Sequence, residues 1–211
     1  MKTMVANGVR GALTLLAFTS VFTALMAGTY ALTKDIVDKN QADAERALIA
    51  QVLPAGSYDN NLLADKTMVP KAEAAELGNA DASPIYLAKK AGKTVGAVVE
   101  ATAPDGYAGK IKLLIGVAPD GQVLGVRVVD HKETPGLGDY IDSKISNWID
   151  QFNGKGLGNP PLERWKVKKD GGDFDSHAGA TISPRAVVKA LGKTLVYVTA
   201  HKAQLFGGAA S

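Results

Sequence analysis

The 211-residue chain contains no cysteine. This absence excludes disulfide bonds, iron–sulfur clusters held by cysteine and any reaction that depends on a thiolate. A redox function would therefore need a bound organic cofactor or a metal site built without thiolates. The chain also lacks an excess of one charge beyond its N-terminus: without Lys2 and Arg10, its 24 basic residues fall to 22, against 21 acidic residues. This balance gives no basic field for nucleic acid, so we expect no nucleic-acid partner.

A stretch without any charge runs from Gly11 to Leu32. A helix of these 22 residues, at ~1.5 Å per residue, can cross the ~30 Å hydrocarbon core of a membrane. Ala27, Gly28 and Ala31 resemble the cleavage site of a secretory signal peptide, but the apolar part of a signal spans only about 7–15 residues. We therefore predict an uncleaved transmembrane helix over this stretch, with a signal peptide as the alternative.

The charges on either side of this stretch predict its orientation. Lys2 and Arg10 lie on the short N-terminal side, whereas the other side begins with the mixed charges of Lys34 and Asp35. Because basic residues concentrate on the cytoplasmic side of membrane proteins, residues 1–10 should form a cytoplasmic tail. The rest of the chain would then lie across the membrane.

Residues 33–83 should contain an amphipathic helix and a connecting loop. Apolar residues recur at roughly helical spacing between Thr33 and Leu53, and Pro54 should end this helix. Residues 55–83 are rich in Asp, Asn, Ala and Gly with weak periodicity, which is typical of a loop. A short helix is expected within them, near residues 70–77.

The remaining residues, 84–211, should form one α+β domain. Apolar and polar residues alternate along several short segments. Turns rich in Gly, Asp and Pro lie between these segments, so the pattern predicts an antiparallel sheet. The patterns place strands at residues 85–88, 94–102, 111–117, 123–131 and 165–168, and helices at residues 141–152 and 183–202. Trp148 and Trp165 should pack in the core. Helices that cover one face of such a sheet give the α+β class.

A loop of small residues leads directly into the final helix. It reads Asp-Ser-His-Ala-Gly-Ala-Thr-Ile-Ser-Pro over residues 175–184. Ser183 followed by proline predicts a helix start, because the hydroxyl can cap free N–H groups and proline suits the first helical position. Gly179 and Ala180 leave the backbone without bulk, and Thr181 adds a hydroxyl at the positive end of the helix, which suits a phosphate. Taken alone, these residues are more typical of a loop and cap without a ligand.

A second group of residues follows the last of the paired strands. It consists of Glu133, Thr134, Pro135, Gly136, Leu137 and Gly138. The proline fixes one backbone angle, while both glycines can adopt positive φ and leave room for a flat group against bare backbone. Backbone N–H groups there could hydrogen-bond the carbonyls of a flavin. On their own, these residues also suit an ordinary Pro-Gly turn.

Together the two groups resemble the signatures of the FMN-binding domain family shared by Rnf-type complexes and sodium-pumping NADH:quinone reductases. The flavinylation motif Asp-x-x-Ser/Thr-Gly-Ala-Thr/Ser is matched at four positions, namely Asp175, Gly179, Ala180 and Thr181. Ala178 departs from it, because the family more often has a hydroxyl residue there. Glu-Thr-Pro-Gly-Leu-Gly resembles the second signature and precedes the motif's threonine by about 45 residues, as in the family. Gly106-Tyr107-x-Gly109-x-Ile111 resembles the family's start of the sheet.

The resemblance covers most of the chain and is greatest to the G subunits of Rnf (Rsx) ion-translocating electron-transport complexes. It implies an FMN joined to Thr181 by a phosphoester. Asp175, Gly179, Ala180, Ser183 and residues 133–138 would surround this cofactor, one loop holding the ring and the other the phosphate. The resemblance also implies a flavin transferase, using FAD and a magnesium ion, that attaches the FMN. The chain would carry electrons between other subunits of the complex without catalytic residues of its own.

By this resemblance the chain would lie in a bacterial inner membrane as a single-pass protein with a cytoplasmic N-terminus and a periplasmic C-terminal domain. Three alternatives remain: a C-type subunit of a sodium-translocating quinone reductase, which is usually longer; a membrane-anchored binding or assembly module without flavin; and a free-standing flavin reductase. A metal site is not expected, because His131, His177 and His201 lack the spacing of metal ligands.

Overall fold

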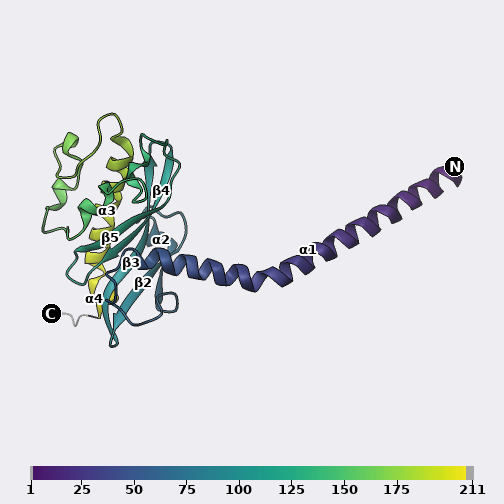
Figure 1. Cartoon of the computed structure of the whole chain (residues 1–211), viewed down its shortest axis with the longest axis horizontal. Helices are drawn as coiled ribbons and strands as arrows, with labels where there is room; N and C mark the ends of the chain where they lie inside the picture. Colours follow the sequence, from purple (N-terminus) through teal and green to yellow (C-terminus); the bar gives the residue numbers. More distant parts are fainter. Residues whose placement is uncertain (1, 208–211) are drawn as a thin grey trace. The chain divides into compact units, whose positions relative to one another are not determined.

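The computed structural model describes residues 2–207, so residues 1 and 208–211 lie outside the description. The predicted segments 1–10 and 84–211 therefore fall partly outside it. The chain divides into two units, Met1–Glu45 and Arg46–Ser211. Residues 46–83, expected to join the membrane helix to the domain, belong to the second unit, several of whose helices and strands are labelled in Figure 1.

Helix α1 (Lys2–Ala50) continues without a break over 49 residues. Within the described residues, Thr3–Ala50 is the one helix long and apolar enough to cross a membrane. The hydroxyls of Thr14, Thr29 and Thr33 in α1 donate to the carbonyl four residues back, as Thr14 does to the Arg10 oxygen at 2.9 Å. These polar side chains therefore need no partner in lipid. The helix passes well beyond residue 32, as the amphipathic pattern indicates, and ends before Pro54.

Five antiparallel strands form one sheet in sequence order. They are β1 (Lys66–Val69), β2 (Ser83–Lys90), β3 (Lys93–Gly106), β4 (Gly109–Val117) and β5 (Val123–Asp130). The short helix α2 (Lys71–Ala74) lies where one was expected. The prediction that residues 66–69 belong to a loop is wrong. They form the edge strand β1, which pairs with β2 from Lys66 opposite Tyr86 to Val69 opposite Ser83. With the helices, the sheet confirms the predicted α+β fold.

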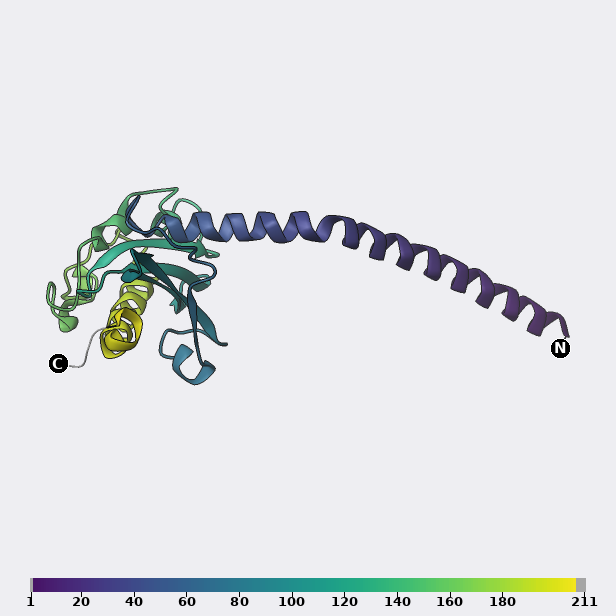
Figure 2. The ribbon, with the colours of Figure 1, turned by 90° about the horizontal axis from the view of Figure 1, so that it is seen from below.

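Both faces of the sheet are covered. Helix α3 (Ile182–Ala200) packs along one face through residues such as Leu191, against Val99 and Ile115 in the larger core (Figure 2). The short helix α4 (Lys202–Phe206) follows it. The opposite face carries a smaller core, in which Val98 and Leu114 pack with Ile49, Val52 and Leu53 from the end of α1 and the residues after it. Side chains that alternate along β3 and β4 thus pack into the larger core on one face of the sheet and into the smaller core on the other.

Glycines in β4 and β5 make room for the chain that follows α1. A Cβ atom at Gly116 would lie 2.1 Å from the Val52 carbonyl oxygen, and one at Gly125 would lie 3.0 Å from the Val52 Cα. Backbone therefore lies directly on the sheet at this point. The folded unit is closed on this face by residues that begin in the last turn of α1.

The single helix predicted over residues 141–152 is wrong. Two 3-10 helices replace it, η1 (Asp139–Ile141) and η2 (Trp148–Phe152). Between them, the Ser146 hydroxyl donates to the Tyr140 carbonyl at 2.6 Å, and the Asp142 carboxylate accepts from the Lys144 N–H at 3.0 Å. Such bonds from side chain to backbone compete with the ladder of a regular helix.

The strand predicted over residues 165–168 is also wrong. The segment makes one isolated bridge, between Val167 and Phe174, and lies between the 3-10 helices η3 (Leu162–Arg164) and η4 (Lys168–Asp170). The chain turns back on itself at Gly171, where φ is +80°. Its apolar residues are nevertheless buried: Trp165 packs on Phe174, with ring centroids 4.8 Å apart. Both tryptophans lie in the larger core, as expected.

Candidate functional site

The two signature loops meet at the N-terminal end of α3. They line a cavity of about 150 Å³ with Tyr107. The cavity residues are Tyr107, Glu133, Thr134, Leu137, Gly138, Gly179, Ala180, Thr181, Ile182 and Ser183. Eight of these ten were singled out in the sequence, whereas Ile182 was missed and Tyr107 was noted only for its place beside the sheet. Asp175, Pro135 and Gly136 were also singled out but do not line this cavity.

Glu133 joins the segments that form the cavity. Its side chain is buried, and its Oε2 accepts a hydrogen bond from the Ser183 hydroxyl at 2.6 Å. Its Oε1 accepts from the Ala108 N–H at 3.1 Å, while the Ser183 oxygen accepts from the Tyr107 N–H at 3.3 Å. One carboxylate and one hydroxyl thus connect the β3–β4 hairpin, the loop after β5 and the start of α3.

The prediction that Ser183 caps the final helix is wrong. Helix α3 begins at Ile182, so Thr181 occupies the cap position, and no side chain caps the helix there. The Ser183 hydroxyl bonds to the Glu133 carboxylate instead. A hydrogen bond to a charged acceptor is roughly twice as strong as a neutral one, which accounts for this choice. The carboxylate also lies at the positive end of α3, where negative charge is favoured.

The two glycines of the Glu133 loop serve different purposes. Gly136 has φ of +76°, as expected, and a Cβ atom there would meet nothing within 4 Å. Gly138 does not have the expected positive φ, since its φ is −91°. A Cβ atom at Gly138 would lie 2.5 Å from the Glu133 Oε2. This glycine is therefore required by the close approach of the buried carboxylate.

Three backbone N–H groups of this loop already bond to Thr134 or to the neighbouring Asp139. The Gly136 N–H donates to the Asp139 carboxylate at 2.9 Å, and the N–H groups of Leu137 and Gly138 donate to the Thr134 carbonyl at 3.1 and 3.2 Å. The expectation that they bind flavin carbonyls does not agree with these partners. The loop instead offers the Leu137 side chain, which is 59% exposed.

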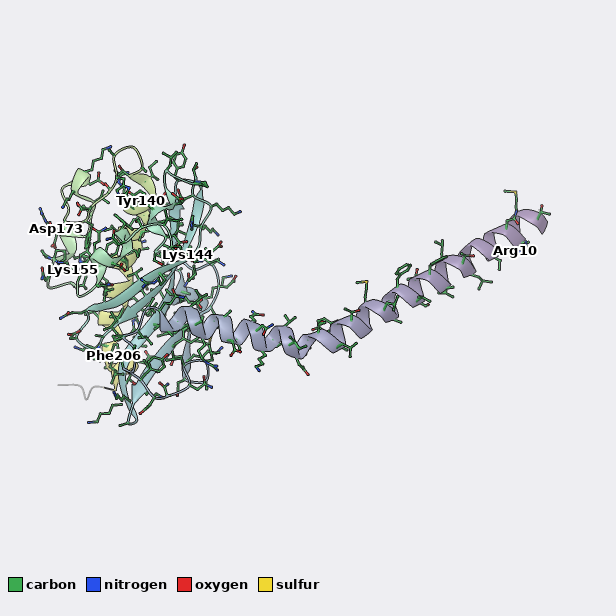
Figure 3. All side chains as sticks on the ribbon, in the orientation of Figure 1. Arg10, Tyr140, Lys144, Lys155, Asp173 and Phe206 are labelled. Carbon is green, nitrogen blue, oxygen red and sulfur yellow. The ribbon has the colours of Figure 1, made fainter. Side chains whose placement is uncertain are left out.

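Three side chains from residues 139–152 hold the loop that contains Thr181. The phenol of Tyr140, a residue labelled in Figure 3, donates to the Ala180 carbonyl at 3.0 Å and accepts from the His177 N–H at 2.9 Å. The Trp148 Nε1 donates to the Asp175 carbonyl at 2.7 Å, and the Gln151 side-chain oxygen accepts from the Asp175 N–H at 2.7 Å. Burial raises the pKa of Tyr140, so its phenol keeps its proton at neutral pH and can donate this hydrogen bond to Ala180.

Sequence reasoning missed Tyr140 and Gln151, because neither belongs to a signature. The side chain of Asp175 is directed to Lys168, at 2.6 Å, and both side chains are largely exposed. Asp175 therefore contributes to the site through its backbone, which Trp148 and Gln151 hold.

The cavity combines an anion-binding end with an apolar rim. Thr181 is buried and lies at the N-terminus of α3, whose first N–H groups have no partner inside the helix and favour a phosphate. The rim carries Tyr107, Leu137 and Ile182, which are 70%, 59% and 44% exposed. A phosphate joined to a flat apolar ring fits this arrangement. At about 150 Å³ the cavity is smaller than the ~300–1,000 Å³ of pockets that enclose a whole small molecule, so it suits partial burial.

Comparison with known proteins gives consistent matches along the chain. The FMN-binding domain family matches residues 106–196, and the RnfG N-terminal region family matches residues 1–52. A protein of Aliivibrio fischeri, named as the G subunit of an ion-translocating oxidoreductase complex, is 45% identical over 196 residues, covering 93% of this chain and 92% of that protein. Proteins of the same name are 44% identical in Pseudoalteromonas atlantica, over 98% of this chain and 94% of the relative, and in Shewanella oneidensis, over 96% and 93%.

Proposed function

The chain belongs to the family of ion-translocating oxidoreductase complex G subunits, and from this premise we propose that it carries electrons through an FMN bound covalently to Thr181. The observation that carries the proposal is the cavity at the start of α3, which the two signature loops line together. The match to the RnfG N-terminal region favours the G type of subunit over the C type of sodium-translocating quinone reductases.

Each part of the cavity has a proposed task. The Thr181 hydroxyl would carry the phosphoester, which the flavin transferase would form by cleaving the pyrophosphate of FAD with release of AMP, and the N-terminus of α3 would stabilise the phosphate charge. Tyr107, Leu137 and Ile182 at the rim would hold the ring by apolar contact, and Thr134 would offer it a hydroxyl. The bound FMN supplies the electron transfer itself. Because the cavity is too small to enclose such a cofactor, the bound FMN would remain accessible to other redox subunits of the complex.

We further propose that the chain is an uncleaved, single-pass protein of a bacterial inner membrane. Residues 1–10 would face the cytoplasm, residues 11–32 would span the membrane and the FMN-binding domain would be periplasmic. Lys2 and Arg10 on the short side support this orientation. The match of residues 1–52 to the RnfG N-terminal region supports the retention of the helix.

The experiment is flavin fluorescence of the denatured full-length chain on a gel, after co-expression with a flavin transferase. The wild type should give a fluorescent band and Thr181→Ala should give none. Thr134→Ala is the matched control, because it removes the other threonine hydroxyl of the cavity and should leave the band. A dark wild-type band beside a fluorescent family member would refute covalent flavin and favour a binding or assembly module.

A further inference from the structure

The loop that ends at Thr181 has little structure of its own. Within residues 175–181 the one backbone hydrogen bond of the turn runs from the Ala180 N–H to the His177 carbonyl, at 3.2 Å. Gly179 supplies the positive φ, +83°, that reverses the chain. An exposed turn with a single bond of its own opens easily, so its conformation depends on what holds it from outside.

The Tyr140 oxygen holds this turn at both ends. It accepts from the His177 N–H at 2.9 Å and donates to the Ala180 carbonyl at 3.0 Å. Its ring is 5% exposed, stacks on the His177 ring at 3.8 Å between centroids, and meets the Trp148 ring edge-on at 5.6 Å. Burial against Trp148 restricts the phenol, and the two hydrogen bonds of its oxygen fix both ends of the turn.

We propose that Tyr140 is a positioning residue for the cofactor: its phenol oxygen fixes the turn from His177 to Ala180 and thereby the place of Thr181 at the cavity. The inference rests on the proposed function, since it concerns the residue that would bear the FMN. Ala180 directly precedes Thr181, so a displacement of the held carbonyl displaces the hydroxyl to which the phosphate would be joined. Tyr140 does not line the cavity, so it would act on the cofactor only through the loop that it holds.

Tyr140→Phe tests this role, because it removes the phenol oxygen and keeps the stacked ring. Tyr197→Phe is the matched control: Tyr197 is equally buried, also stacks on a histidine and bonds to Glu73 at 3.1 Å, but does not contact the loop. Deuterium exchange of the full-length chain in detergent should be roughly five- to thirtyfold faster in residues 176–181 of Tyr140→Phe, the factor expected from losing one or two hydrogen bonds. The control should leave exchange there unchanged.

A second readout separates positioning from general stability. In flavin-loaded protein, visible circular dichroism and the midpoint potential report the surroundings of the ring, and both should change in Tyr140→Phe and remain as in wild type in Tyr197→Phe. Unchanged exchange and spectra in flavin-loaded Tyr140→Phe would overturn the positioning role alone. A wild-type chain that accepts no flavin would overturn the proposed function, and this role with it.

A third variant separates the oxygen from the ring stack. His177→Ala removes the stacked imidazole and leaves both contacts of the Tyr140 oxygen, so exchange in the loop should remain within about twofold of wild type. If exchange in the loop of His177→Ala is as fast as that expected for Tyr140→Phe, ring stacking rather than the phenol oxygen orders the loop, and the inference is overturned. This comparison remains decisive should Tyr140→Phe fail to fold.

Discussion

Replacing Gly138 with alanine should destabilise the folded unit much more than the same change at Gly136. The new Cβ atom at Gly138 would lie 2.5 Å from the Glu133 Oε2 and 3.3 Å from the Glu133 Cβ. Glu133 can withdraw only by weakening its bonds to the Ser183 hydroxyl, at 2.6 Å, and the Ala108 N–H, at 3.1 Å. Both partners belong to other segments of the chain, so the disturbance extends through the whole site.

The magnitudes follow from the contacts. A hydrogen bond to a charged group contributes about 1.5–3 kcal/mol, so losing one at Glu133 should lower the free energy of unfolding by about 2–3 kcal/mol. At Gly136 a Cβ atom meets nothing within 4 Å, but φ is +76°. That backbone conformation costs an alanine about 1 kcal/mol once the lower entropy of the unfolded chain is included.

Urea titration of the full-length chain in detergent, followed by tryptophan fluorescence, measures the difference. Both tryptophans, Trp148 and Trp165, are buried in the folded unit and none lies in the membrane helix, so the signal reports the domain. With a slope of about 2 kcal/mol per molar urea, the midpoint should fall by about 1–1.5 M for Gly138→Ala and about 0.5 M for Gly136→Ala. Equal shifts, or a larger one at Gly136, would refute the reasoning that Glu133 is held in place.

Three further predictions test other contacts. Ser183→Ala removes the donor to Glu133 and should lower the free energy of unfolding by about 1.5–3 kcal/mol in the same titration; a loss below about 0.5 kcal/mol would contradict the charge-assisted bond. Burial, together with a hydrogen bond to Glu73, raises the pKa of Tyr197 to about 12. In the unfolded chain the pKa of this phenol is ~10. The stability that Tyr197 contributes should therefore be complete below that pH and be lost as the pH rises toward 12. Tyr197→Phe should remove this pH dependence from unfolding curves at alkaline pH. Gly116→Ala places a methyl group 2.1 Å from the Val52 oxygen, so it should cost about 2–4 kcal/mol and speed proteolysis near Val52; unchanged cleavage would mean that this segment does not lie on the sheet.

The sequence predicts the elements that bury a continuous apolar face. It does not predict the short elements that form only through backbone pairing or side-chain hydrogen bonds. Strands β2 to β5 and helix α3 follow from alternating or helical apolar residues, because each buries a continuous face. Strand β1 has four residues, of which only Val69 is buried, so no pattern marks it. It forms because its backbone pairs with β2. The 3-10 helices η1 and η2 likewise depend on side-chain bonds that periodicity does not reveal.

The same limit applies to the candidate site. The residues that line the cavity could be predicted because they carry recognisable chemistry, such as the Thr181 hydroxyl. Tyr140, which holds the loop of Thr181 from 40 residues away in the chain, has no such mark. Its role depends on where residues 139–152 pack, and that depends on the aromatic core around Trp148 and Phe152. Long-range contacts of this kind are fixed by the fold rather than by local sequence.

The residues of the two signatures and the start of α3 separate into two sets once the contacts of Glu133 are known. Glu133, Gly138 and Ser183 hold the loops together: the carboxylate needs the serine as its donor and needs the glycine for room. Thr181 and Leu137 instead offer the cavity a hydroxyl and an apolar surface. Changes in the first set should act chiefly on the free energy of unfolding, and changes in the second chiefly on cofactor attachment and spectrum. A family signature therefore includes residues that hold the site together as well as residues that line the cavity, and the contacts in the structure distinguish the two.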